Sequence, residues 1–61
     1  MIDTAQKTIS VLIAEDSPTQ RETLAMMLEE AGGFAVAGMA QDGVEAVAAT
    51  ERLRPDIVLM D

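Results

Sequence analysis

The pattern of apolar and polar positions divides the chain into three short apolar runs separated by two helical segments. The runs cover residues 9–14, 34–40 and 57–60, and their aliphatic content is typical of strands buried in a parallel sheet. Between them, residues 18–31 and 43–53 carry apolar side chains at helical spacing. We therefore expect a βαβαβ chain of the α/β class.

Each helical segment begins with a capping signal. Ser17 precedes the first segment, and Gln20 stands three residues later, which is the pattern of a capping box. Asp42 and Glu45 repeat the pattern at the second segment. We expect Asp42 to act as a helix cap rather than as a metal ligand.

The apolar stripe on each helix predicts the face that packs on the sheet. The expected stripes are Leu24, Met27, Leu28 and Ala31 in the first helix, and Val44, Val47 and Ala48 in the second. Methionine commonly fills gaps in protein cores. We therefore also expect core positions for Met26, Met27, Met39 and Met60.

The expected topology follows from the handedness of parallel crossovers. Right-handed connections and a central first strand give the strand order 2-1-3, with one helix on each face of the sheet. In this order the first and third strands are neighbours, so Asp16 and Asp61 lie at adjacent strand ends. The third run, residues 57–60, is expected to be a buried strand, and residues 1–8 are expected to form a flexible lead-in.

Composition narrows the range of possible functions. With 61 residues the chain is one domain at most, and without cysteine or histidine it has no disulfide and no thiolate or imidazole chemistry. A net charge of −7 argues against a nucleic acid as direct partner. No apolar run is long enough to span a membrane, and the N-terminal residues lack the pattern of a signal peptide. We expect a cytoplasmic protein.

Three carboxylates are expected to converge at the carboxyl edge of the sheet: Glu15, Asp16 and Asp61. Two bare charges about 4 Å apart repel by about 4 kcal/mol at an effective dielectric constant of about 20, so the cluster favours a cation. Oxygen ligands without histidine or cysteine suit Mg²⁺. The hypothesis is a weak Mg²⁺ site in which Asp16 ligates, Glu15 assists through water and Asp61 ligates or reacts. The alternative is that Glu15 and Asp16 only mark the solvated end of a strand.

Three motifs together resemble the N-terminal half of a two-component response-regulator receiver domain of the CheY-like family. They are residues 11–17 (VLIAEDS), 42–46 (DGVEA) and 54–61 (RPDIVLMD). The resemblance implies a flavodoxin-like fold, and because CheY-like receivers share the strand order derived above, that order is not independent of it. It also implies that Asp61 is the phosphoacceptor for a histidine kinase, that Asp16 is the principal Mg²⁺ ligand and that Glu15 is the second acid. Such a module is a phosphorylation switch rather than an enzyme.

The main departure from the family is that the sequence stops at Asp61. The family supplies a further carbonyl ligand, a switch Ser or Thr and a Lys from later positions, so we expect this fragment, truncated after its third strand, to be inactive. Residues 57–60 would then form an exposed apolar edge, which predicts self-association. The alternative is that the sequence is part of a longer chain.

Two functional questions stay open at this point. The first question is whether the chain is a receiver module or, as the alternative, a nucleotide-binding βαβ fragment of an oxidoreductase or NTPase. No glycine-rich phosphate-binding motif follows the first strand, which weakens the alternative. Residues 36–43 (VAGMAQDG) resemble receivers of chemotaxis methylesterases and also regulators with DNA-binding outputs. The sequence does not separate these outputs.

Overall fold

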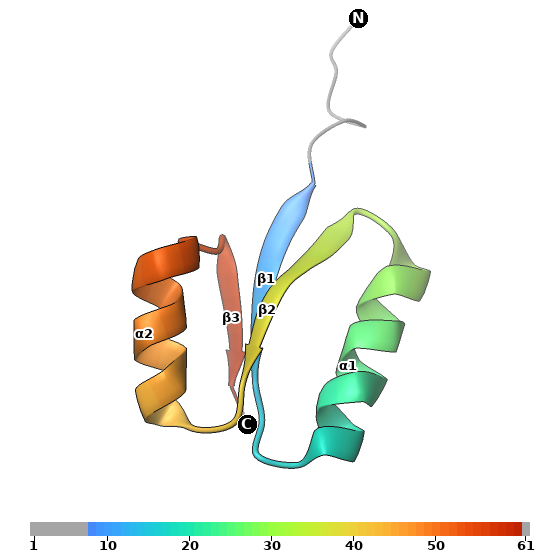
Figure 1. Cartoon of the computed structure of the whole chain (residues 1–61). Coiled ribbons are helices and arrows are strands. Elements are labelled where there is room, and N and C mark those ends of the chain that lie inside the picture. Colours follow the sequence, from blue (N-terminus) through green and yellow to red (C-terminus); the bar gives the residue numbers. More distant parts are fainter. Residues whose placement is uncertain (1–7, 61) are drawn as a thin grey trace, which may run out of the picture.

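The computed structural model describes residues 8–60, and it has the five expected elements (Figure 1). In chain order they are β1 (Ile9–Ala14), α1 (Pro18–Ala31), β2 (Phe34–Ala40), α2 (Gly43–Leu53) and β3 (Ile57–Met60). The α/β class and the element boundaries are therefore confirmed. Most of the expected lead-in, and position 61, lie outside the described residues.

The strands form one parallel sheet in the order β2-β1-β3, as predicted. Ala14 at the end of β1 is the register partner of Ala40 on β2 and of Met60 on β3. The carboxyl ends of all the strands therefore lie at one edge of the sheet. Figure 1 shows the sheet between the two helices, with α1 on one face and α2 on the other.

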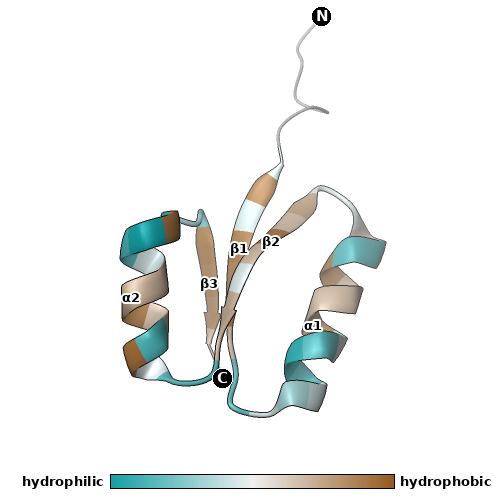
Figure 2. Ribbon diagram, viewed as in Figure 1, coloured by the Kyte–Doolittle hydropathy of each residue, from teal (hydrophilic) through white to brown (hydrophobic). Residues whose placement is uncertain are grey.

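The core is centred on β1. Val11, Leu12, Ile13 and Ala14 are at most 5% exposed because β1 has a strand on each side and a helix over each face. Figure 2 shows hydrophobic residues concentrated along the strands. The prediction that this apolar run is buried on both faces is confirmed.

The face of α2 that packs on the sheet differs from the predicted stripe. Ala46 and Ala49 are its buried residues, whereas Val44 is 82% exposed and Val47 is 62% exposed. Ala46 clusters with buried alanines at the ends of β1 and β2, so small side chains mark the contact and allow a close approach. Hydrophobicity alone selected the wrong side of this helix.

The predicted packing face of α1 was only partly correct. Leu24 and Leu28 are half-buried as expected, but Ala31 is exposed and Met27 is 59% exposed. Arg21 shares the inner face instead, since its guanidinium bonds to the end of β1. All the methionines expected in the core are exposed: Met26, Met27, Met39 and Met60.

The prediction that residues 57–60 form a buried strand was wrong, whereas the exposed apolar edge expected for the truncated chain is present in the described residues. On β3, Val58 and Leu59 are half-buried, while Ile57 and Met60 are exposed. Within the described residues β3 pairs only with β1, so one of its edges is without a partner strand. An aliphatic run by itself does not tell a central strand from a strand at the edge of a sheet.

Hydrogen bonds between Ser10 and Asp56, which the sequence analysis did not identify, join the segment before β3 to the start of β1. The Ser10 N–H donates to Asp56 Oδ2 at 2.9 Å, and its hydroxyl donates to the same oxygen at 3.2 Å. The Asp56 N–H in turn lies 2.9 Å from both Ser10 O and Ser10 Oγ. These bonds fix the register of β3 at the end of the strand opposite the carboxylates.

Neither α1, with 14 residues, nor α2, with 11, is long and apolar enough to cross a membrane; these are the helices of the described part of the chain.

Gly38 provides the space in which α2 packs against β2. A Cβ added there would lie 2.7 Å from Leu53 Cδ1 and 3.5 Å from Leu12 Cδ1. We expect Gly38→Ala to lower the free energy of unfolding by about 1 kcal/mol, because Leu53 must leave its present position. Urea denaturation measures the change.

Gly43 supplies the matched control. A Cβ there meets nothing within 4 Å and the residue lies in α2, so we expect Gly43→Ala to be neutral or to stabilise the fold by up to about 1 kcal/mol. Equal destabilisation by both substitutions would contradict the steric role of Gly38.

Candidate acidic site at the carboxyl edge of the sheet

The site lies where the polypeptide leaves β1 and β3. The Glu15 N–H donates to the Ala40 carbonyl at 2.9 Å, so the ladder between β1 and β2 continues one residue beyond Ala14. Met60 is the register partner of Ala14 on the other side. The end of β3 is therefore next to the segment that carries Glu15 and Asp16. Asp61 follows Met60 in the sequence and lies outside the described residues.

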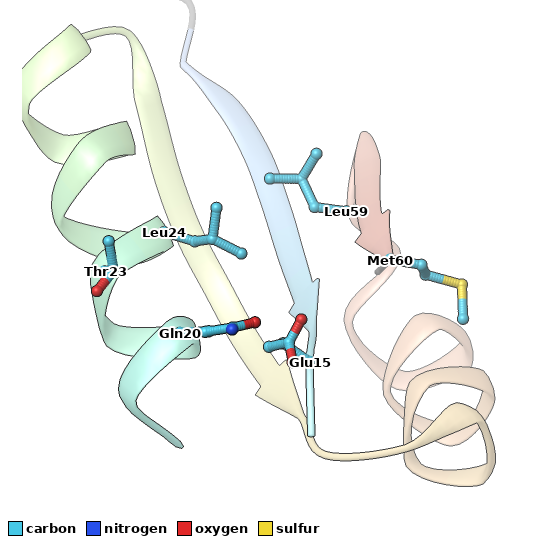
Figure 3. Close-up of a pocket in the computed structure, with 6 residues that line it drawn as sticks. All are labelled: Glu15, Gln20, Thr23, Leu24, Leu59 and Met60. Atoms are coloured by element: carbon cyan, nitrogen blue, oxygen red, sulfur yellow. The ribbon is translucent and has the colours of Figure 1, made fainter. Parts of the chain in front are cut away.

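Glu15 is a buried carboxylate, only 5% exposed, at the junction of β1 and α1. Its Oε1 accepts the Ser17 N–H at 3.2 Å. The Gln20 amide faces the same carboxylate (Figure 3), and with its nitrogen turned inward it donates to Oε1 at 3.1 Å and to Oε2 at 3.2 Å. Burial of this charge is therefore compensated by neutral hydrogen-bond donors from the first turn of α1.

The cap of α1 differs from the predicted capping box. Ser17 is the N-cap as expected, because its Oγ accepts the Gln20 N–H at 3.3 Å. The reciprocal bond from the Ser17 N–H goes to Glu15 rather than to the Gln20 side chain. A charged carboxylate is the stronger acceptor, and it leaves the Gln20 amide free to donate.

Arg21 holds the backbone of the same residue. Its Nη1 donates to the Glu15 carbonyl oxygen at 2.8 Å. The sequence analysis treated Gln20 as a capping partner and assigned no role to Arg21, so it missed both contacts with Glu15. The available signal was their position in the first two turns of a helix that starts directly after the carboxylates.

Asp16 is exposed and lines a pocket of about 260 Å³. The pocket also contacts Glu15, Asp42 and Met60, so it lies between the ends of β1 and β3 and the start of α2. Asp42 contributes as a helix cap, as predicted, since its Oδ1 accepts the Glu45 N–H at 2.8 Å.

The second predicted capping box is also modified. Glu45 accepts the Gln41 N–H at 3.0 Å and the Gln41 side-chain amide at 3.2 Å, not the N–H of Asp42. The carboxylate thereby fixes the loop one residue before the cap. Because Gln41 lines the pocket beside Asp16, this contact also shapes the rim of the pocket.

A second pocket, of about 440 Å³, lies on the α1 side of Glu15. Figure 3 shows Glu15 and Gln20 directed toward each other, with Leu24 of α1 and Leu59 of β3 farther along the pocket. Glu15 and Met60 line both pockets. The Glu15 carboxylate therefore lies at the boundary between an apolar space and a polar one.

The described residues provide a partial donor set for Mg²⁺. Within residues 8–60, no group of three or more acidic, histidine or cysteine side chains is arranged to hold a metal ion. Glu15 and Asp16 nevertheless line one pocket, and Mg²⁺ characteristically takes one or two carboxylates together with water and phosphate oxygens. The all-oxygen chemistry of the pair fits this ion.

Comparison with known proteins decides the family. The family model described as the response regulator receiver domain matches residues 11–61, which include every strand and helix from the middle of β1 onward. The chain belongs to the response regulator receiver domain family. It is therefore a receiver module of a two-component system, and the family resemblance inferred from the motifs is confirmed, together with the CheY-like strand order.

The relatives are larger proteins with different outputs. The chain is 47% identical over 53 residues to protein-glutamate methylesterase/protein-glutamine glutaminase 4 of Myxococcus xanthus, covering 87% of this chain and 15% of that protein. It is 49% identical over 53 residues to protein-glutamate methylesterase/protein-glutamine glutaminase 2 of Anaeromyxobacter dehalogenans, covering 87% of this chain and 16% of that protein.

A relative with another kind of output is transcriptional regulatory protein BtsR of Escherichia coli. It is 38% identical over 53 residues, covering 87% of this chain and 22% of that protein. The chain thus spans only about 15–22% of the length of the relatives described here. No solved structure gives a significant match. The family match also leaves the nucleotide-binding alternative without support.

Proposed function

We propose that residues 9–61 are the N-terminal half of a receiver domain in which Asp61 accepts a phosphoryl group from a histidine kinase. The observation that carries this proposal is the register between Ala14 and Met60, which brings the end of β3 beside Glu15 and Asp16. In parallel α/β sheets, ligands bind outside the carboxyl ends of the strands. The polar pocket of about 260 Å³ opens at this edge.

In the proposed reaction an Asp61 carboxylate oxygen attacks the phosphorus of the phosphohistidine. A P–O bond forms and the P–N bond breaks, so the imidazole nitrogen leaves with the bonding electron pair. In this proposal Asp16 would hold Mg²⁺ directly and Glu15 would hold it through water. When bound, Mg²⁺ neutralises charge on the transferring group, which Glu15 and Asp16 would otherwise repel.

The proposal makes the chain a phosphorylation switch in the cytoplasm rather than an enzyme. The chain supplies the proposed phosphoacceptor, Asp61, and the acidic pocket formed by Glu15 and Asp16. We assign it no nucleic-acid or membrane partner. The net charge of −7 is unfavourable for binding phosphate-rich surfaces. Any output would come from sequence outside this chain, as with the much longer relatives.

The test is phosphoryl labelling of the complete gene product in which the chain lies. Incubation with radiolabelled acetyl phosphate and Mg²⁺ is expected to give a base-labile acyl phosphate, and EDTA is expected to prevent it. The 61-residue chain alone is expected to stay unlabelled, because the family's further carbonyl ligand, switch Ser or Thr, and Lys have no match within residues 1–61. Absence of Mg²⁺-dependent label on the complete protein would overturn the proposal.

We further propose that the isolated chain self-associates through β3. Ile57 and Met60 are exposed, and an apolar strand with an unpaired edge is a template for pairing with another chain. Sedimentation at tens of micromolar protein is expected to show dimers or larger species. Met60→Lys is expected to shift the population toward monomer, since a charged side chain on an edge strand opposes pairing. A monomeric wild-type chain would contradict this.

A further inference from the structure

The contact between Gln20 and Glu15 joins α1 to the acidic site. The Gln20 amide faces the Glu15 carboxylate, and the orientation that pairs a donor with an acceptor has the amide nitrogen turned inward, 3.1 Å from Oε1 and 3.2 Å from Oε2. In this orientation one donor group spans both oxygens. Together with the Ser17 N–H on Oε1, it fixes the rotation of the carboxylate about its last bond. The Ser17 N–H and the Gln20 amide, both neutral donors, thus orient the buried Glu15 side chain from the α1 side.

Gln20 does not line the pocket that contains Asp16. It lines the larger apolar space, whereas Glu15 lines both spaces. Any influence of Gln20 on a cation beside Asp16 must therefore pass through Glu15. This is the arrangement in which a hydrogen-bond partner orients a metal-binding carboxylate without touching the metal.

We propose that Gln20 is a positioning residue that holds Glu15 in the orientation required for Mg²⁺ binding, an inference that rests on the function proposed above. The amide donates to the carboxylate without neutralising its charge, so Glu15 stays available to a cation or its bound water. Loss of such a partner characteristically weakens metal affinity by about 10–100-fold.

The test measures Mg²⁺ binding by isothermal titration calorimetry, and also the initial rate of labelling by acetyl phosphate as a function of Mg²⁺ concentration, using the complete gene product. In Gln20→Met, which keeps the length of the side chain but has no donor, we expect the half-saturating Mg²⁺ concentration to rise by at least about 10-fold. The maximal rate at saturating Mg²⁺ is expected to stay within about 3-fold of wild type, because the reacting groups are intact. Gln20→Asn, whose amide is one methylene too short to reach Glu15, is expected to behave in the same way.

Thr23→Val is the matched control. Thr23 is also an exposed residue of α1 that lines the same pocket as Gln20, but its hydroxyl donates to the Thr19 carbonyl at 3.0 Å rather than to Glu15. Its half-saturating Mg²⁺ concentration is expected to remain within about 3-fold of wild type, well below the change expected for a lost orienting partner. Thermal unfolding of every variant shows whether the fold is retained, and Gln20→Asn replaces Gln20→Met if the latter does not fold.

Two results would overturn the role of Gln20 while leaving the proposed function intact. The first is a half-saturating Mg²⁺ concentration that is unchanged in both Gln20 variants. The second is a loss of maximal rate without any change in Mg²⁺ dependence, which indicates a structural role alone. If the wild-type protein takes up no label, the proposed function fails, and the assignment of Gln20 fails with it.

Discussion

Asp61→Ala is expected to reduce phosphoryl labelling of the complete protein to background at any Mg²⁺ concentration. The substitution removes the only oxygen nucleophile that the proposed reaction uses, and no neighbouring group replaces it in line with the leaving group. The two neighbouring carboxylates lie elsewhere. The Glu15 carboxylate faces the Gln20 amide, and Asp16 follows β1 rather than β3. The measurement is scintillation counting of the protein after incubation with radiolabelled acetyl phosphate, with peptide mapping of the wild-type label.

Asp56→Asn is the matched control for this experiment. Asp56 precedes β3 as Asp61 follows it, but Asp56 interacts with Ser10 at the opposite end of the strand. We expect this variant to keep its label and to lose at most about 1 kcal/mol of stability, since an amide oxygen still accepts the Ser10 donors. Label that survives Asp61→Ala would refute the assigned acceptor.

Leu12→Ala is expected to unfold most of the 61-residue chain at room temperature. Leu12 is fully buried at the centre of the sheet, and truncation of such a leucine costs about 2–5 kcal/mol. Folded chains have a free energy of unfolding of about 0.05–0.15 kcal/mol per residue, so little stability is left after this loss. Circular dichroism during urea denaturation, at one fixed protein concentration, measures the effect.

Met27→Ala provides the comparison for the core substitution. The Met27 side chain is 59% exposed on α1, so we expect the free energy of unfolding to change by no more than about 0.5 kcal/mol. This is a sharp contrast, because the apolar pattern of the sequence assigned Met27 to the packed face. A loss at Met27 that equals the loss at Leu12 would show that α1 packs differently.

The element boundaries were predictable because local chemistry specifies them. Ser17 and Asp42 accept the N–H groups of residues three positions later, which starts each helix where the sequence indicated. At the other end of α2, Arg54 adopts φ 51° and its N–H donates to the Thr50 carbonyl at 2.8 Å, immediately before a proline that stops the helix. Such signals act within a few residues and need no knowledge of the rest of the fold.

The strand order was predictable for a different reason. Two consecutive right-handed crossovers from a buried first strand leave few arrangements, and the order β2-β1-β3 was among them. The resemblance to CheY-like receivers implied the same order. This order also brings Met60 beside Ala14, and it makes the acidic edge a reasonable hypothesis from sequence. The arrangement of the carboxylates themselves did not follow from that reasoning.

The packed faces of the helices could not be read from hydrophobicity. On α2 the contact is made by Ala46 and Ala49, while the larger Val44 and Val47 point outward. Close approach between a helix and a sheet is limited by side-chain size, so alanine can be buried where valine does not fit. A hydrophobicity pattern treats alanine and valine alike as apolar, so it does not reveal the effect of their different sizes.

The sequence by itself determined the strands, the helix caps, the order of the sheet and the family, because each follows from patterns local in the chain or from the handedness of its connections. Only the tertiary structure decided which helix faces are buried and how Glu15 is held by Gln20 and Arg21. Those contacts depend on the rotation of α1 relative to the end of β1. That rotation is set by the packing of whole elements, and no stretch of sequence specifies it alone.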